Sequence, residues 1–233
     1  MKKCAAWCWA NENADMLTLK DVSVDIAGVP VLRRLSVDMK PGATYAIVGR
    51  NGAGKTTLLR TIMGLCAVRA GIISLAGKDL LAAPSFQRAA LGIGYAPEDR
   101  VLFPTMTVLE NLHLPCEAIG MMAAETSERV RTAVAVVPLI EPMLGRSAAA
   151  LSGGQGKMAA LARALMTGTR LLLLDEPFQG LAPALARQCA LALSQLHQLR
   201  PDLCVVIAES NQALLTQVTC TMLTLERGEL KTG

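Results

Sequence analysis

The sequence predicts an α/β fold built on a mainly parallel β-sheet, with a small antiparallel β region before it. Three observations predict this class. A glycine-rich loop, Gly49-Arg50-Asn51-Gly52-Ala53-Gly54-Lys55-Thr56-Thr57, stands between a short apolar strand and a helix. Later in the chain, short apolar runs alternate with helical patterns, as they do in parallel sheets covered by helices. Helical patterns also fill a long stretch, about residues 99–150, between these two parts.

The chain begins with strands. Residues 17–24 and 32–39 alternate apolar and polar side chains, which is typical of half-buried antiparallel strands. Residues 71–77 form a further strand bracketed by glycines. Residues 1–15 precede this alternation, so we expect them to be a dispensable, disordered tail and residues 16–233 to be a single domain.

The glycine-rich loop has the pattern of a phosphate-binding loop. It follows an apolar strand at 44–48 and opens a helix at 55–63, whose N-terminus carries partial positive charge. Glycines let backbone N–H groups converge on phosphate oxygens. Lys55 can reach the β- and γ-phosphates, and the Thr56 hydroxyl can ligate Mg²⁺. The sequence therefore predicts a nucleoside triphosphate held by Gly49, Asn51, Gly52, Ala53, Gly54, Lys55, Thr56 and Thr57.

The middle of the chain is predominantly helical. After a short strand at 93–96, helical patterns cover 107–114 and 123–137, and we expect prolines 115, 138 and 142 to be breaks. Leu151-Ser152-Gly153-Gly154-Gln155 then opens a helix at 156–166. Ser152 suits an N-cap, and the two glycines let the backbone approach an anion at the helix start. Read alone, this segment is an ordinary capped helix.

The last part of the chain returns to alternating strands and helices. An apolar strand at 171–174 ends in Asp175-Glu176-Pro177, which by itself reads as a core strand followed by an acidic turn. A helix at 184–199, a strand at 203–207 and a closing hairpin through 226–229 follow. This alternation predicts parallel strands with helices on both faces of the sheet.

The phosphate loop, the LSGGQ segment and the strand ending in Asp-Glu-Pro, in this order, resemble the nucleotide-binding subunit of ATP-binding-cassette (ABC) transporters. The resemblance covers about residues 16–230 and implies a P-loop NTPase fold with a helical subdomain at about 99–150. It implies that Asp175 holds Mg²⁺ and that Glu176 is the general base, or orients the water, for attack on the γ-phosphate of ATP. It also implies that Ser152, Gly153, Gly154 and Gln155 cap an ATP held by a second cassette.

Three further segments resemble one subfamily, the second ATPase subunit of branched-chain (hydrophobic) amino-acid importers. They are residues 95–104, Gly180-Leu181-Ala182-Pro183 and Ala208-Glu209-Ser210-Asn211. This resemblance implies uptake of branched-chain amino acids or, second, of urea, short amides or related carboxylates. It implies two membrane permease subunits, a second ABC ATPase subunit or another copy of this chain, and an extracytoplasmic solute-binding protein. The implied location is peripheral, at the cytoplasmic face of the plasma membrane.

Three positions depart from the general cassette pattern. Glu98 stands where most members have a Gln that contacts Mg²⁺; a carboxylate is a good Mg²⁺ ligand but adds negative charge beside phosphates. Ser210 replaces the switch His or Gln at the γ-phosphate, and Ile26 replaces an aromatic residue that stacks on adenine. Since Lys55 and Glu176 are intact, we expect an active ATPase that is slow alone. The alternative is a catalytically weak regulatory cassette paired with an active partner cassette.

Amino-acid composition restricts the possible partners and cellular location of the protein. The net charge of +4 is mild and does not require a nucleic-acid partner. No apolar run approaches the roughly 18 residues of a transmembrane helix. The 52% hydrophobic content fits a large core together with an interface to membrane subunits. Seven cysteines without metal-type pairing predict a reducing compartment and no disulfide framework.

Overall fold

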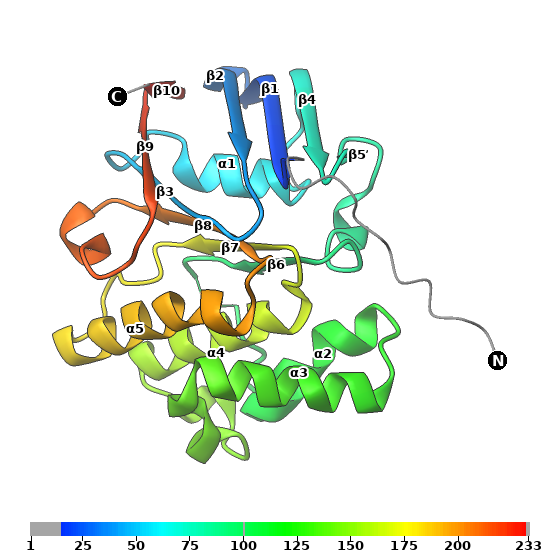
Figure 1. Ribbon diagram of the computed structural model, residues 1–233, viewed down its shortest axis with the longest axis vertical. Helices are drawn as coiled ribbons and strands as arrows, with labels where there is room; N and C mark the ends of the chain where they lie inside the picture. The colour runs from blue at the N-terminus through cyan, green and yellow to red at the C-terminus, as the bar shows by residue number, and fades with distance from the viewer. Residues whose placement is uncertain (1–14, 100, 232–233) are drawn as a thin grey trace.

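The computed structural model describes residues 15–99 and 101–231 and contains two β-sheets (Figure 1). The first is antiparallel, with strand order β2-β1-β4-β5, and the second has the order β10-β9-β3-β8-β7-β6. In the second sheet, β9, β3, β8, β7 and β6 are parallel and β10 pairs antiparallel with β9. The strands are β1 (Leu17–Ile26), β2 (Val29–Met39), β3 (Thr44–Val48), β4 (Ala70–Leu75), β5 (Lys78–Asp79), β6 (Ile93–Ala96), β7 (Leu171–Asp175), β8 (Cys204–Glu209), β9 (Thr221–Glu226) and β10 (Glu229–Lys231).

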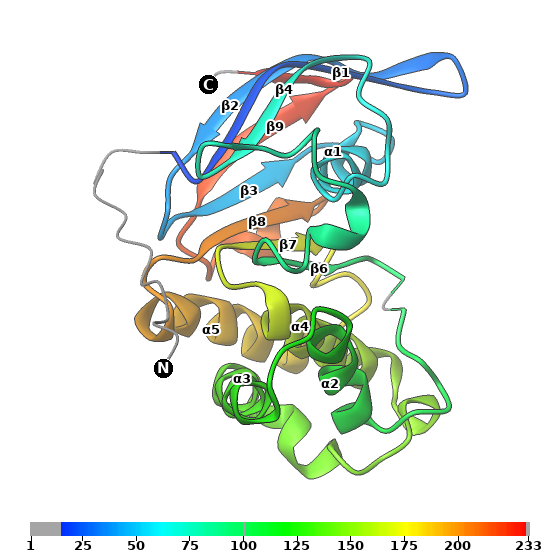
Figure 2. The same ribbon diagram turned by 90° about the vertical axis from the view of Figure 1, so that its right-hand side faces the viewer.

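The helices lie on both sides of the second sheet. Helix α1 lies on the side of the antiparallel sheet, and α4 and α5 lie on the opposite side with α2 and α3 beyond them (Figure 2). Their bounds are α1 (Lys55–Ile62), α2 (Val108–Ala118), α3 (Ala123–Val136), α4 (Gly153–Thr167) and α5 (Pro183–Leu199). Short 3₁₀ helices occupy 85–87, 138–143, 148–150 and 212–215.

The central strands are apolar on both faces because both faces are covered. Ile47 and Val206 pack in the cluster that includes α1 and the antiparallel sheet, whereas their neighbours Val48 and Ile207 pack in the cluster of α4 and α5. This double burial explains why β3, β7 and β8 show continuous apolar runs rather than alternation. Since these strands are parallel, their carboxyl ends share one edge, where such sheets bind ligands.

The predicted proline breaks need correction at two positions. Helix α2 does not end at Pro115 but runs through it to Ala118. Cys116, one residue later, is fully buried against the core, so packing outweighs the hydrogen bond that a proline cannot donate. The predicted break at Pro138 is confirmed, because α3 ends at Val136 and Pro138 opens a separate 3₁₀ helix, 138–143. Pro142 lies inside that 3₁₀ helix and does not end it.

The predicted N-terminal tail lies outside the described residues, except for Asp15. The Asp15 carboxylate pairs with the Lys40 ammonium at 2.7 Å, and the Met16 N–H donates to the Met39 carbonyl at 2.7 Å. The described chain is therefore tied to the end of β2 from its first residues. We take residues 1–14, rather than 1–15, as the segment to delete in a truncation.

The cysteines in the described part of the chain are free thiols. Burial raises the pKa of Cys189 and of Cys204 to about 12, so both thiols stay protonated at neutral pH. Inside α5 and β8 they pack as small apolar side chains.

Candidate functional site

A pocket of about 380 Å³ lies at the carboxyl edge of the parallel strands. Its lining comes from the loops after β3, β6 and β7, together with β2 and α1. Eight of the ten lining residues are predicted site residues, the exceptions being Val31 and Gln179. The apolar side chain at its wall is Val31, whereas Ile26 is 44% exposed at the end of β1 and does not line it. The lining residues are Val31, Asn51, Gly52, Gly54, Lys55, Thr56, Thr57, Glu98, Glu176 and Gln179.

The backbone of the phosphate loop requires its glycines. Gly52 and Gly54 have φ angles of 81° and 108°, in the left-handed region that favours glycine. At Gly49, a Cβ atom would stand 2.3 Å from the Leu225 carbonyl oxygen. The loop is thereby packed on β9 and leads directly into α1 at Lys55. The first N–H groups of that helix lack intrahelical partners and can bind an anion.

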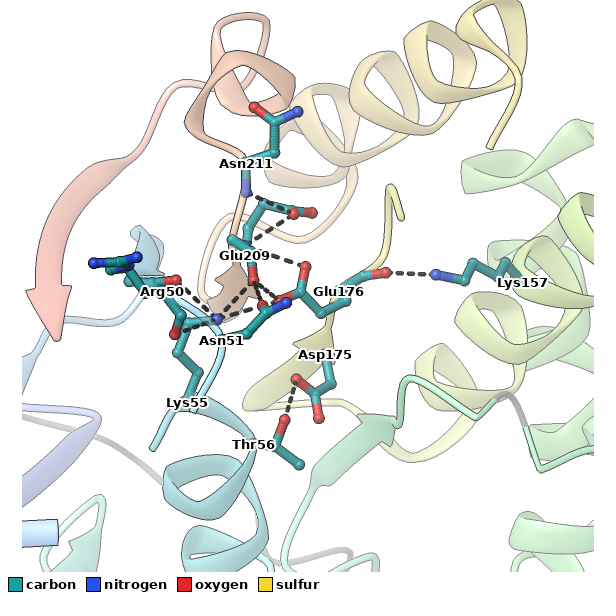
Figure 3. A network of polar contacts seen from close by, with 11 residues as sticks. Arg50, Asn51, Lys55, Thr56, Lys157, Asp175, Glu176, Glu209 and Asn211 are labelled. Atoms are coloured by element: carbon teal, nitrogen blue, oxygen red, sulfur yellow. Dashed lines mark hydrogen bonds and ion pairs between the residues drawn. The ribbon is translucent and has the colours of Figure 1, made fainter. Parts of the chain in front are cut away.

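Lys55 of α1, Glu176 after β7 and Ser210 after β8 come from separate segments and contact one another in a network of polar contacts, part of which Figure 3 labels. The Lys55 ammonium donates to the Gly49 carbonyl at 2.9 Å and to the Ser210 hydroxyl at 2.8 Å, and lies 3.3 Å from Glu176 Oε1. The Ser210 hydroxyl lies 2.5 Å from Glu176 Oε1 and 2.8 Å from Asn51 Oδ1. The Ser210 N–H donates to Glu176 Oε2 at 3.1 Å. The predicted catalytic residues Glu176, Lys55 and Ser210 therefore form one connected network.

The main chain at Glu176 is held in an unusual conformation. Its φ angle is 47°, in the left-handed region that costs a non-glycine residue about 1–2 kcal/mol. Its N–H donates to the Ala208 carbonyl at 2.9 Å, and its carbonyl accepts from Lys157 Nζ at 2.7 Å and from the Gln179 N–H at 3.2 Å. These contacts hold the turn after β7 so that the carboxylate faces Lys55 and Ser210.

The predicted magnesium ligands have the chemistry of a Mg²⁺ site. Asp175 is 2% exposed, and the Thr56 hydroxyl donates to its Oδ1 at 3.1 Å while its Oδ2 has no partner within the described residues. Burial first, and then the charges of Glu98 and Glu176, raise the pKa of Asp175 to about 6. A cation beside this carboxyl would relieve both effects. Glu98 contributes an exposed carboxylate from the pocket wall.

The protein alone does not complete that site. Residues 15–99 and 101–231 contain no group of three or more His, Cys, Asp and Glu side chains that could hold a metal ion. Mg²⁺ commonly takes one or two protein oxygens and fills its shell with phosphate oxygens and water. Asp175, Thr56 and Glu98 fit that pattern when a triphosphate is bound.

The LSGGQ residues lie apart from this pocket. Ser152 caps α4 with a capping box: its hydroxyl accepts from the Gln155 N–H at 3.3 Å, and Gln155 Oε1 accepts from the Ser152 N–H at 3.0 Å. Ser152 and Gly153 are exposed, and Gly154 is half-buried with a Cβ position 2.3 Å from Leu185 Cδ2. None of Ser152, Gly153, Gly154 and Gln155 is among the lining residues of the phosphate-loop pocket.

Two residues join the site that the sequence analysis gave no role. Glu209, the last residue of β8, is 1% exposed and accepts the N–H groups of Ser210 at 3.0 Å and Asn211 at 3.1 Å. Lys157 reaches from α4 to the Glu176 carbonyl. The sequence could have indicated a role for Glu209, because a carboxylate that directly follows an apolar parallel strand lies at the edge of the sheet where ligands bind. Lys157 gave no such signal, because a lysine in the first turns of a helix is ordinary.

Glu209 gives the chain a pH-dependent stability. Burial first, and then the neighbouring Glu176, raise the pKa of Glu209 from 4.5 to about 7. The folded chain holds this proton up to a pH near 7, whereas the unfolded chain releases it near pH 4.5, so folding stability falls as pH rises through that interval. Between roughly pH 6 and 8 we expect a loss of about 1 kcal/mol, or about 2–4 °C in Tm.

Thermal unfolding of the chain in chelator, without nucleotide, measures this shift. Glu209→Gln keeps the shape of the side chain without a titrating group, so its Tm should fall less over the same interval. An equal fall in both proteins would contradict the assignment.

Sequence comparison places these features among known proteins. A family model described as "ABC transporter" matches residues 32–179. The high-affinity branched-chain amino acid transport ATP-binding protein BraG of Pseudomonas aeruginosa is 34% identical over 202 residues, 85% of this chain and 84% of that protein. The probable branched-chain amino acid transport ATP-binding protein LivF of Archaeoglobus fulgidus is 34% identical over 183 residues, 78% of this chain and 75% of that protein.

Relatives of comparable identity carry other names. Among them are spermidine/putrescine and Fe(3+) ions import ATP-binding proteins, at 32% and 38% identity, of which this chain covers 57% and 50%. The chain thus spans about half the length of several curated relatives.

Among solved structures, the dimeric MJ0796 bacterial ABC transporter cassette matches with a TM-score of 0.81 at 24% identity, over 93% of this chain and 97% of that one. Within the described residues, no helix has the length and apolar character needed to span a bilayer.

Proposed function

This chain belongs to the ABC transporter family and is an ATPase cassette of that family, and from this we propose that it powers solute import through separate membrane subunits. The observation that carries the proposal is the meeting of Lys55 and Glu176 at one pocket beneath the phosphate loop, with Asp175 hydrogen-bonded to Thr56 of the same pocket. Each is the residue type that ATP hydrolysis requires at its position, and together they couple phosphate binding, metal binding and water activation.

The proposed division of labour follows from the contacts. The loop N–H groups and Lys55 bind the phosphates, and Thr56, Asp175 and Glu98 would hold Mg²⁺, which would neutralise negative charge of the phosphates. Glu176 orients the attacking water and accepts its proton. Ser210, within hydrogen-bond distance of both Lys55 and Glu176, aligns them at the γ-phosphate.

The assembly is proposed to contain two cassettes. Ser152 and Gly153 are exposed at the N-terminus of α4, and none of residues 152–155 lines the pocket of their own chain, which supports a role at a second cassette's ATP. That cassette is a related ATPase subunit or another copy of this chain. Two permease subunits and an extracytoplasmic solute-binding protein complete the importer, with this chain peripheral at the cytoplasmic face of the membrane and no nucleic acid involved.

Branched-chain amino acids are the proposed cargo. BraG and LivF, whose names refer to these solutes, match over most of this chain, although relatives named for other solutes match with similar identity. The site itself contacts ATP rather than cargo. We therefore base the cargo proposal on the subfamily resemblance of residues 95–104, 180–183 and 208–211.

A catalytically weak, regulatory cassette is the second candidate. Ser210 is shorter than the His or Gln of other cassettes, and Glu98 adds negative charge that raises the pKa of the buried Asp175. An intact Glu176, ion-paired with Lys55 at 3.3 Å, supports the active cassette instead. The two candidates differ in whether this chain's own site turns over ATP.

Uptake by cells that carry wild-type chain or Lys55→Ala tests the import proposal. Lys55→Ala removes the phosphate-binding charge, so we expect it to lose ATP binding and to reduce uptake of labelled leucine to that of the deletion strain. Thr57→Ser, which keeps a hydroxyl in the same loop, is the matched control and should transport normally. Leucine uptake that is unchanged in the deletion strain would contradict the branched-chain proposal, and the same comparison with urea or short amides would then decide the cargo.

A further inference from the structure

Glu209 is a buried carboxyl at the site that has no role in the proposed ATP hydrolysis. It is 1% exposed at the end of β8, beside the turn that carries Ser210. Its Oε1 accepts two main-chain N–H groups of that turn, at 3.0 and 3.1 Å (Figure 3). Its Oε2 is buried and has no partner with a donor proton among the described residues. A buried carboxyl oxygen of this kind requires its own proton or a neighbouring donor.

The group that faces Glu209 is the carboxyl of Glu176. Glu209 Oε1 and Glu176 Oε2 accept the same Ser210 N–H, at 3.0 and 3.1 Å, so the two carboxyls stand side by side at this turn. Because two buried carboxylates this close do not both carry charge at neutral pH, one of the two must carry a proton. Negative charge is better stabilised on Glu176, which is 3.3 Å from the Lys55 ammonium and accepts the Ser210 N–H. The proton therefore belongs to Glu209, which donates it to the Glu176 carboxylate.

The electrostatics of the pair agree with this placement. Burial raises the pKa of Glu209 to about 7, with Glu176 adding to the effect. Burial also raises the pKa of Glu176, but hydrogen bonds from Glu209 and Ser210 and the charge of Lys55 outweigh it and hold that pKa below its usual range. Other titratable groups near the pair are Asp175 of β7, Lys157 of α4 and Cys189 of α5, and the Cys189 thiol stays protonated at neutral pH.

We propose that Glu209 is a positioning residue for ATP hydrolysis: its protonated carboxyl holds the Glu176 carboxylate in place and ties it to the turn of Ser210. The inference rests on the proposed role of Glu176 in activating water. The short Ser210 side chain makes this tie necessary. Because a serine hydroxyl reaches only its immediate neighbours, the main chain of the turn must be fixed close to Glu176, and Glu209 fixes it through two N–H groups.

Two substitutions of Glu209 separate hydrogen bonding from packing. In Glu209→Gln, the amide oxygen accepts the same two N–H groups and the amide nitrogen donates to Glu176, so it imitates the protonated acid. Glu209→Leu has similar volume and neither function. In ATPase assays of the full-length chain, with the subunits that co-purify with it, we expect kcat of Glu209→Gln within about threefold of wild type. We expect kcat of Glu209→Leu to fall about tenfold or more, with the Kd for ATP changed by less than about threefold.

A pH series provides the second readout. An ionised Glu209 cannot donate to Glu176, so the ratio of kcat in Glu209→Gln to kcat in wild type should rise as pH goes from 6.5 to 8.5. If Glu209→Leu fails to fold or to bind ATP, the test rests on the ratio of kcat in Glu209→Gln to kcat in wild type. A ratio that stays constant from pH 6.5 to 8.5 overturns the inference. Equal kcat in Glu209→Leu and Glu209→Gln would also overturn it. If wild type is no faster than Glu176→Gln, the proposed function itself fails, and the inference fails with it.

Discussion

Glu176→Gln should abolish ATP turnover while preserving ATP binding. The amide keeps the size of the side chain and can still accept hydrogen bonds from Ser210, but it cannot take a proton from water. A general base contributes about 10²–10⁴-fold, so we expect kcat to fall at least about 100-fold. In the folded chain the Glu176 carboxylate lies 3.3 Å from the Lys55 ammonium, and removing its charge frees Lys55 for phosphate. ATP affinity should therefore be equal to wild type or tighter.

Comparison with Lys55→Ala separates a loss of ATP turnover from a loss of ATP binding. It should lose both ATP binding and turnover, whereas Glu176→Gln should lose turnover alone. Filter binding or fluorescent ATP analogues measure affinity, and phosphate release measures turnover. Unchanged turnover in Glu176→Gln would remove the residue from the proposed chemistry. A wild-type rate no higher than that of Lys55→Ala would favour the regulatory cassette.

Gly154→Asp should block ATP-dependent pairing of two cassettes without weakening ATP binding by the isolated chain. Gly154 lies in the first turn of α4, where the partial positive charge of the helix N-terminus can face the γ-phosphate of an ATP held by the partner. A carboxylate there would face phosphate oxygens, and like charges that are partly buried repel strongly. We expect ATP, but not ADP, to pair wild-type cassettes, and neither nucleotide to pair the variant.

The structure supplies the matched control for this test. Any Cβ at position 154 would stand 2.3 Å from Leu185 Cδ2, so Gly154→Asp also disturbs the contact between α4 and α5. Gly154→Ala creates the same contact without the charge. Gel filtration or ATP-dependent crosslinking should show pairing in Gly154→Ala and none in Gly154→Asp. If Gly154→Asp pairs normally and turns over ATP, the shared-site arrangement is wrong for this protein. If both variants fail equally, packing against Leu185 rather than charge is the cause.

Local patterns predicted most of the elements. The apolar runs at 44–48, 93–96 and 171–174 are strands, and the glycine-rich loop lies between β3 and α1, as predicted. These features were predictable because a strand buried on both faces needs a continuous apolar run, and a left-handed backbone favours glycine. The prediction was wrong at Pro115, where the helix continues. Local rules count the hydrogen bond lost at a proline, but they do not count the burial of Cys116 that outweighs it.

The sequence by itself determined the family of this protein and the residues of its phosphate loop, its Asp-Glu turn and its LSGGQ segment, because their chemistry depends on residue types at short, fixed spacings. Only the tertiary structure decided that Ser210 meets Lys55 and Glu176, that Lys157 holds the Glu176 carbonyl, and that the Glu209 carboxyl accepts the N–H groups of Ser210 and Asn211. These contacts join residues far apart in the chain. Parallel pairing of β3, β7 and β8 brings their carboxyl ends together, and the register of that pairing cannot be read from any one segment.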